Sequence, residues 1–260
     1  MNAFQAVLLG IIQGLTEFIP VSSSGHLVIF QYFLDIQEGQ LLFNVVLHLG
    51  TLIPIFIIYW SDIKGIMLFK KEKRKESFYI LLAIIPTGII GVLFEDFFAS
   101  LFSNPFLTAL MLVLTGIILY LSEVLEGGGK ELEDLKFWQP LIVGLAQSGA
   151  IIPGISRSGA TIAASLFQDL NRETAARFSF LMSIPVIGGA GFLQLLNVIE
   201  AGSISFDLSL LIIGALSAAV SGYIAIKIVL KFLKEKKLNY FSYYCWTAAA
   251  VVVILALLKQ

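Results

Sequence analysis

The stretch GIIQGLTEFIPVSSSGH, residues 10–26, decides the fold of this chain, because proline, three serines and a glycine interrupt an apolar, helix-forming run. Such an interruption leaves backbone N–H groups without helix partners, and the hydrocarbon of a lipid bilayer offers no acceptor for them. Broken backbone at membrane depth is therefore stable only where protein buries it or where it lines a wet cavity. The stretch predicts a broken helix whose ends face a polar site.

A second copy of this pattern, GLAQSGAIIPGISRSGAT, occupies residues 144–161. Identical residues superpose at one constant offset: Gly10 on Gly144, Gln13 on Gln147, Ser22 on Ser156, Ser24 on Ser158 and Gly25 on Gly159. Only the prolines, Pro20 and Pro153, are out of register, by one position. Two such breaks in one chain predict a single site that both of them build.

The composition identifies the class of protein. Of 260 residues, 58% are hydrophobic and 13% are charged, and the mean hydropathy is +0.90, which indicates an integral membrane protein. The net charge of −1 gives no argument for a nucleic-acid partner, and none is expected. The lone cysteine, Cys245, excludes an internal disulfide.

Six apolar runs are long enough to cross a membrane core, which needs about 20 helical residues. We place them near residues 41–60, 78–94, 105–122, 178–199, 208–230 and 240–258. The apolar run after each break is too short to cross, because residues 26–34 and 160–168 each span roughly 14 Å as helix. The broken segments are therefore predicted to be re-entrant helix–loop–helix pairs, each entering and leaving on one side.

Basic residues orient these spans. Fifteen of the 17 Lys and Arg residues lie in four stretches: residues 64–75, 130–136, 172–177 and 227–237. The six-span layout places all four stretches on one face, which is cytoplasmic by the positive-inside rule. The charged residues of the opposite loops are all acidic: Asp35, Glu38, Glu95, Asp96, Glu200 and Asp207. Both termini are expected on that opposite, extracytoplasmic side.

Three full spans separate the two breaks, and because three is odd, the second broken segment enters from the side opposite to the first. We therefore expect an all-α integral membrane protein with six transmembrane helices, two re-entrant segments and an inverted-topology repeat. The chain is interpreted as a single membrane domain, residues 1–260, with repeat one at about 1–125 and repeat two at about 138–260. Such repeats direct half-helix N-termini at anionic groups near the membrane midplane, so an anionic ligand is expected.

Four ionisable side chains fall well inside the apolar core, where charge is costly: Glu17, His26, His48 and Arg157. Glu17 follows Gln13 by four residues, so both share one helix face and can point their oxygens at one cation or one water. Arg157 is followed by Ser158 and Gly159, which begin a short helix. A guanidinium group beside the N–H groups of a helix N-terminus is typical of a phosphate site.

The hydroxyl groups near the breaks are weaker candidates, because most serines at such positions cap helices or satisfy turns. His26 follows Ser23 by three residues, close enough for its imidazole to meet the hydroxyl or a bound phosphate. Thr161 lies one turn into the helix after Arg157 and could donate to the same anion. His48 has no candidate site residue near it in the sequence and is interpreted as a helix-packing residue.

Residues 13–26 and 153–161 closely resemble the two signature motifs of the bacterial undecaprenyl-diphosphate phosphatase family, the bacitracin-resistance type. The resemblance covers the whole chain in length and span order, and it includes residues 177–185. The family's first motif begins with Glu or Gln, so Gln13 is the milder variant.

This resemblance implies hydrolysis of an isoprenyl diphosphate lipid, undecaprenyl diphosphate, at a site that faces the extracytoplasmic side of the bacterial plasma membrane. The product, undecaprenyl phosphate, is the lipid carrier that is reused for peptidoglycan synthesis and cell wall biogenesis, which links the family to antibiotic resistance. The resemblance also implies dependence on a divalent cation, Mg²⁺ or Ca²⁺. The sequence is compatible with a homodimer.

On this interpretation Arg157 binds the diphosphate, and further substrate contacts come from eight residues: Gln13, Ser22, Ser24, Gly25, Ser156, Ser158, Gly159 and Thr161. Glu17, helped by Gln13, holds the cation or orients the attacking group. Ser23 is the preferred nucleophile, with His26 as base or as acid toward the leaving oxygen. Direct attack by a water held by Glu17 or His26 uses the same residues and stays open.

A transporter or flippase for polyprenyl phosphate is the alternative function, because inverted repeats with broken helices are the usual build of secondary transporters. The gathering of serine, histidine, glutamate and arginine at the breaks favours chemistry over transport. The vanadium-haloperoxidase-like lipid phosphatases are a poor match, since they need a second histidine six residues after the arginine, where this chain has Ala163.

Overall fold

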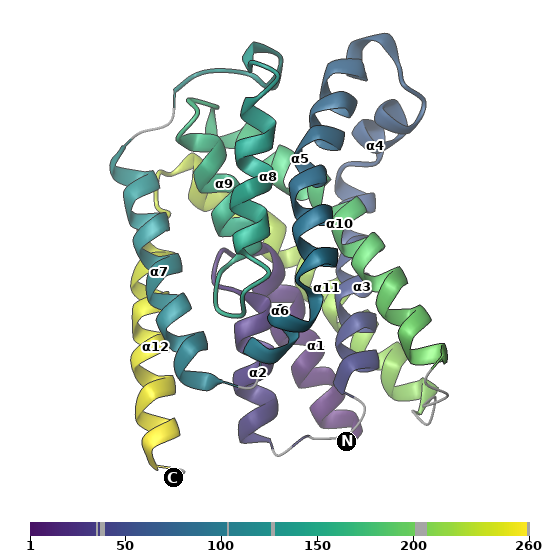
Figure 1. The fold of residues 1–260 in the computed structure, drawn as a ribbon, viewed down its shortest axis with the longest axis vertical. Coiled ribbons are helices and arrows are strands. Elements are labelled where there is room, and N and C mark those ends of the chain that lie inside the picture. The colour runs from purple at the N-terminus through teal and green to yellow at the C-terminus, as the bar shows by residue number, and fades with distance from the viewer. Residues whose placement is uncertain (35, 37–39, 103, 126–127, 201–206, 259–260) are drawn as a thin grey trace.

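The computed structural model describes residues 1–34, 36, 40–102, 104–125, 128–200 and 207–258, which are predominantly α-helical (Figure 1). The helices are α1 (Ala3–Phe18), α2 (Ser23–Phe33), α3 (Gln40–Ile58), α4 (Trp60–Met67), α5 (Arg74–Leu93), α6 (Glu95–Leu101), α7 (Pro105–Val124), α8 (Gln139–Gly149), α9 (Arg157–Leu166), α10 (Arg172–Glu200), α11 (Leu208–Lys234) and α12 (Asn239–Leu258). Short 3₁₀ turns, Lys71–Lys73 and Leu132–Asp134, come before α5 and α8.

Among the described residues, five helices are each long and apolar enough to cross a membrane: α5, α7, α10, α11 and α12. The helices α3 and α4 form a sixth candidate, a pair bent by 93°. These candidates coincide with the six apolar runs, which confirms the prediction of an all-α, multi-pass membrane protein. Two details differ from the prediction, because α10 begins at Arg172 and not near residue 178, and the short helix α6 follows α5.

The early start of α10 is explained by charge pairing at the end of the molecule that carries the basic stretches. The guanidinium group of Arg177 on α10 lies 2.9 Å from Asp62 and 3.4 Å from Glu76. The ammonium group of Lys73 pairs with the same two carboxylates. Because each charge has an opposite partner, the helix continues beyond its apolar run without an isolated charge in the packed interior.

The two broken segments form hairpins that point into the molecule from opposite ends (Figure 1). The hairpin α1–α2 enters from the end that carries both termini, and α8–α9 enters from the end that carries α4. This arrangement agrees with re-entrant segments in an inverted repeat, while the residue limits of the two repeats stay a prediction. Asp35 and Glu38, which were counted with the acidic loops, lie outside the described residues.

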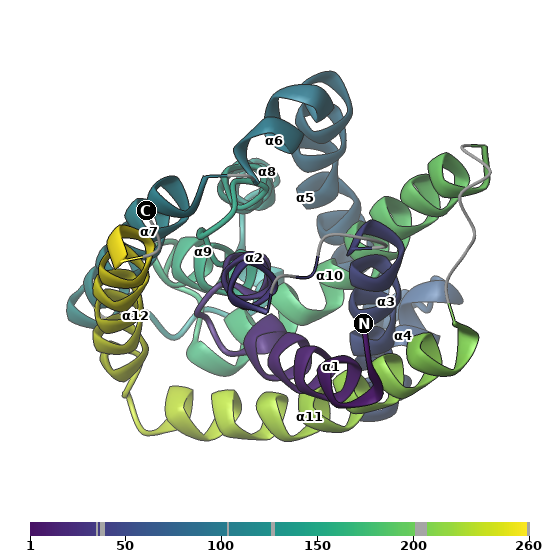
Figure 2. The same ribbon diagram turned by 90° about the horizontal axis from the view of Figure 1, so that it is seen from below.

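Glycines at equivalent positions of the repeat pack each hairpin against a span of the other repeat. Helix α1 lies along α11 (Figure 2), and α8 packs against α5. A Cβ atom on Gly10 would lie 2.5 Å from the carbonyl oxygen of Gly214, and one on Gly144 would collide with the carbonyl oxygen of Ala83. Small residues permit such close backbone approach between membrane helices. This packing carries both breaks to the centre of the molecule.

Candidate active site

The two breaks contact each other directly. Ser22 Oγ accepts hydrogen bonds from the backbone N–H of Gly25 in its own break, at 3.3 Å, and from that of Gly154 in the other break, at 3.2 Å. Gly154 has a φ of +99°, and a Cβ atom there would collide with the backbone of α7, so this position requires glycine. Thr115 on α7 holds the second break by bonding the carbonyl of Gly154 and the N–H of Ser156.

Equivalent serines cap the two short helices that follow the breaks. Ser22 caps α2, and Ser156 caps α9 by accepting from the N–H of Gly159 at 3.1 Å. The N–H of Gly159, which we expected to bind the diphosphate, is therefore already bonded within the protein. Ser22 has a φ of +70°, an unusual conformation for serine that the buried contacts between the breaks maintain.

Both helix N-termini keep unused donors. In the described part of the chain, the backbone N–H groups of Ser23, Ser24, Arg157 and Ser158 have no protein acceptor. The hydroxyls of Ser24 and Ser158 lie 3.4 Å and 3.3 Å from those of the two capping serines. Partial positive charge and free N–H groups at two converging N-termini favour an anion between them.

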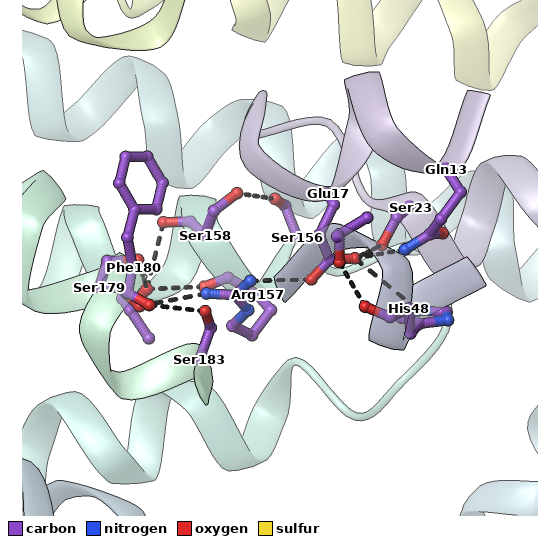
Figure 3. Close-up of polar contacts among 12 residues, drawn as sticks. Gln13, Glu17, Ser23, His48, Ser156, Arg157, Ser158, Ser179, Phe180 and Ser183 are labelled. Atoms are coloured by element: carbon purple, nitrogen blue, oxygen red, sulfur yellow. Dashed lines mark hydrogen bonds and ion pairs between the residues drawn. The ribbon is translucent and has the colours of Figure 1, made fainter. Parts of the chain in front are cut away.

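Glu17 is the centre of the polar contacts, between Arg157 on one side and Gln13, Ser23 and His48 on the other (Figure 3). Its Oε1 accepts from Arg157 Nη2 at 2.8 Å. Its Oε2 accepts from Ser23 Oγ at 2.7 Å and from Gln13 Nε2 at 2.8 Å. Glu17 is only 5% exposed, and a buried carboxylate is tolerated when it is paired and hydrogen-bonded, as it is here. The structure thus brings together Gln13, Glu17, Ser23 and Arg157 as the sequence predicted.

Helix α10 positions Arg157. The carbonyl oxygen of Ser179 accepts from Arg157 Nη1 at 3.2 Å, so the guanidinium group is held at both ends. The hydroxyl of Ser179 lies 2.6 Å from that of Thr161, which also donates to the carbonyl of Arg157 at 2.8 Å. Thr161, expected to donate to the anion, therefore braces α9 against α10. Sequence reasoning did not assign Ser179 a role, although it lies in residues 177–185 of the resemblance.

In the described structure His26 forms no hydrogen bond with Ser23 or Glu17. Its Nδ1 lies 2.8 Å from the carbonyl oxygen of Ser22, and its Nε2 lies 2.8 Å from the hydroxyl of Tyr244 on α12. Both ring nitrogens are thus engaged, and the rings of His26 and Tyr244 stack with their centroids 5.7 Å apart. This geometry therefore does not support the predicted role of His26 as the base for Ser23.

His48 lies in the site, whereas the sequence suggested only helix packing. Its Nε2 is 3.7 Å from Glu17 Oε2. Helix α3 is apolar on most of its faces, so no periodic pattern marks the side that turns toward the break. The available signal was the cost of any ionisable group inside a membrane span, which applied to His48 as much as to His26.

The atoms around Glu17 fit a divalent cation. Gln13 is fully buried, and its Oε1 has no hydrogen-bond donor. Carboxylate and amide oxygens are common ligands of divalent cations. Across the described ranges, no three His, Cys, Asp or Glu side chains form a metal site, so further ligands here would include the Gln13 amide, water or a phosphate.

Comparisons with known proteins identify the family of this chain. The family model described as "Bacitracin resistance protein BacA" matches residues 6–251. A protein of Halothermothrix orenii named undecaprenyl-diphosphatase is 54% identical, over 98% of this chain and 99% of its own length. Proteins with the same name from Alkaliphilus metalliredigens and Methanosphaera stadtmanae are 43% and 38% identical, also over almost their whole lengths. A site shared by two broken helices, a family match over nearly all residues and full-length relatives together show that this chain belongs to the bacitracin resistance protein BacA family.

Proposed function

We propose that this protein hydrolyses undecaprenyl diphosphate to undecaprenyl phosphate and inorganic phosphate. The names of its full-length relatives support this activity. The site also contains a guanidinium group that can bind phosphate and a hydroxyl that can attack it. The product is a lipid carrier that can be used again in cell wall synthesis. The apolar spans support a location in the cell membrane, and the family resemblance supports a site that faces the extracytoplasmic side. The positive-inside bias supports an orientation with the basic loops in the cytoplasm.

The observation that carries the proposal is the position of Glu17. This carboxylate binds Arg157, a phosphate-binding group, and accepts a hydrogen bond from Ser23, a potential nucleophile, between two helix N-termini. Arg157 and the free N–H groups of Ser23, Ser24 and Ser158 would bind the diphosphate oxygens. Anion binding alone would not require a hydroxyl held by a carboxylate, so hydrolysis is favoured over transport.

Ser23 is placed for nucleophilic attack on the terminal phosphorus. Its hydroxyl already donates to Glu17 Oε2, so the proton passes to this carboxylate as Ser23 Oγ bonds to phosphorus and the bond to the bridging oxygen breaks. Undecaprenyl phosphate leaves, and water then hydrolyses the phosphoserine to release inorganic phosphate. Direct attack by water on the diphosphate uses the same residues. A chiral terminal phosphate distinguishes the two routes, because a phosphoserine gives net retention and direct attack gives inversion.

A bound divalent cation, Mg²⁺ or Ca²⁺ by family resemblance, would neutralise phosphate charge. Glu17 and Gln13 would hold it. His26, with both nitrogens engaged, supports the break through Ser22 and Tyr244.

The test is phosphate release from farnesyl diphosphate by the purified protein in detergent, where a transporter has no second compartment. We expect wild-type protein to release phosphate and Glu17→Gln to lose at least about a hundredfold in turnover. The matched control is Glu123→Gln, which alters another largely buried glutamate that pairs with Arg172 at 2.9 Å outside the site. Absence of release by folded wild-type protein, or equal loss in both variants, would contradict the proposal.

A further inference from the structure

One hydrogen bond of His48 indicates which of its ring nitrogens carries the proton in the neutral ring. Its Nδ1 lies 2.8 Å from the backbone carbonyl oxygen of Asn44, one turn earlier on α3. A carbonyl oxygen can only accept, so Nδ1 carries the proton and donates it. In the neutral ring, Nε2 then presents a lone pair, and this nitrogen faces Glu17.

Glu17 Oε2 accepts from Ser23 and Gln13, but in the described structure two acceptor atoms beside it, His48 Nε2 and Gln13 Oε1, have no protein donor. His48 Nε2 and Glu17 Oε2 are 3.7 Å apart, and two acceptors cannot hydrogen-bond to each other. Gln13 donates its amide N–H to the same Glu17 oxygen, which leaves its own Oε1 buried without a donor. The side chains of His48 and Gln13 thus both contact Glu17, and imidazole nitrogen, amide oxygen and carboxylate oxygen are all ligands of divalent cations.

The charge of the site also calls for a cation. Glu17 and Arg157 form a close ion pair, so their opposite formal charges cancel. A diphosphate entering this pair would meet no net positive charge from these two side chains. A divalent cation beside Glu17 would supply that charge and attract the anion.

We infer that His48 is a ligand of a divalent cation that it shares with Glu17 and Gln13. The inference rests on the proposed function, since it concerns the cation of the same site. Mg²⁺ and Ca²⁺ prefer oxygen ligands, whereas imidazole suits first-row transition metals. The mixed donor set therefore favours a borderline cation such as Mn²⁺ over Mg²⁺ or Ca²⁺.

The two histidines of this chain make the inference directly testable. In the described structure His48 Nε2 has no hydrogen bond and lies 3.7 Å from Glu17 Oε2, whereas both ring nitrogens of His26 are engaged by Ser22 and Tyr244. Electron paramagnetic resonance of bound Mn²⁺ detects a directly coordinated imidazole through its nitrogen coupling. The measurement uses untagged, full-length protein in detergent, so that no other histidines contribute.

We expect wild-type protein to bind Mn²⁺ with an imidazole nitrogen coupling. His48→Gln replaces the nitrogen by an amide oxygen, so Mn²⁺ should still bind while the coupling disappears. His26→Gln should keep the coupling. Glu17→Gln should weaken Mn²⁺ binding at least about tenfold, because the carboxylate is the charged ligand. In competition, Mg²⁺ should displace Mn²⁺ more readily from His48→Gln than from wild type.

Several outcomes would overturn the inference. These are no Mn²⁺ binding, bound Mn²⁺ without nitrogen coupling in wild type, or a coupling that survives in His48→Gln. Phosphate release by the same wild-type preparation separates this failure from that of the proposed function. Release without nitrogen coupling rejects only the role of His48, whereas coupling without release supports the cation site and rejects the hydrolase.

Discussion

At the scale of single residues, Arg157 links the two repeats. One end of its guanidinium group pairs with Glu17 of the first repeat, and the other end donates to the carbonyl of Ser179. At the position equivalent to Arg157 the first repeat has Ser23, so the second copy of the break supplies the guanidinium group and the first copy supplies the hydroxyl. The two copies also differ at Glu17, where the second copy has Ile151, so the site is asymmetric although the breaks are similar.

We expect Arg157→Lys to lower turnover of farnesyl diphosphate about a hundredfold or more, which corresponds to roughly 3 kcal/mol of transition-state stabilisation. Lysine keeps the charge but cannot present two donors in a fixed plane to a phosphate group. Steady-state phosphate release measures the effect. Arg172→Lys, which alters an arginine paired with Glu123 outside the site, serves as control and should remain close to wild type. Near-normal turnover by folded Arg157→Lys would remove this residue from the site.

At the scale of elements, the site depends on how closely the re-entrant hairpins pack against the spans. Gly144 on α8 lies against the backbone of α5 at Ala83, and Thr87 on the same span donates to the Gly144 carbonyl at 3.1 Å. Gly88, the next residue on α5, has no neighbouring atom within 4 Å of a built Cβ. A side chain at Gly144 would therefore meet the neighbouring backbone, whereas a side chain at Gly88 would have open space.

We expect Gly144→Ala to destabilise the protein by about 1–3 kcal/mol, because the added methyl group forces two backbones apart. Gly88→Ala should instead be neutral or stabilise by roughly 0.5–1 kcal/mol, since alanine favours the helix and meets no obstacle. Thermal unfolding in detergent compares both variants with wild type. Equal stability of the two variants would show that α8 does not pack closely on α5.

At the scale of the whole molecule, the inverted arrangement fixes which loops share a side. Asn104 precedes α7 and Asp207 precedes α11, at the end of the molecule that carries the termini, whereas Lys71 and Lys236 lie among the basic stretches at the other end. Exposed basic loops favour the cytoplasm, so the two ends should differ in access from outside the cell.

Single cysteines at Asn104 and Asp207, in a Cys245→Ser background, should react with a membrane-impermeant maleimide in intact cells. Cysteines at Lys71 and Lys236 should react only after permeabilisation. Labelling of Asn104 and Asp207 on opposite sides would contradict the inverted repeat. Labelling of both only from the inside would keep the fold and reject an extracytoplasmic site.

The sequence by itself determined the membrane class, the six spans, the two breaks and most residues at the centre of the site. These follow from the cost of burying charge and unpaired backbone groups in hydrocarbon, which acts at each position whatever its distant neighbours are. One site built by both breaks was predicted, but the ion pair between Glu17 and Arg157 was not.

Only the tertiary structure decided which atoms meet. It turns His48 toward Glu17, engages His26 with Ser22 and Tyr244, and uses Thr161 to brace Ser179. It also extends α10 back to Arg172, where Asp62 and Glu76 neutralise Arg177. These contacts join residues far apart in the chain, and an apolar membrane helix has no polar face to show which side meets its partner. The residue types therefore predicted which chemical groups the site contains, whereas helix packing decided how these groups contact one another.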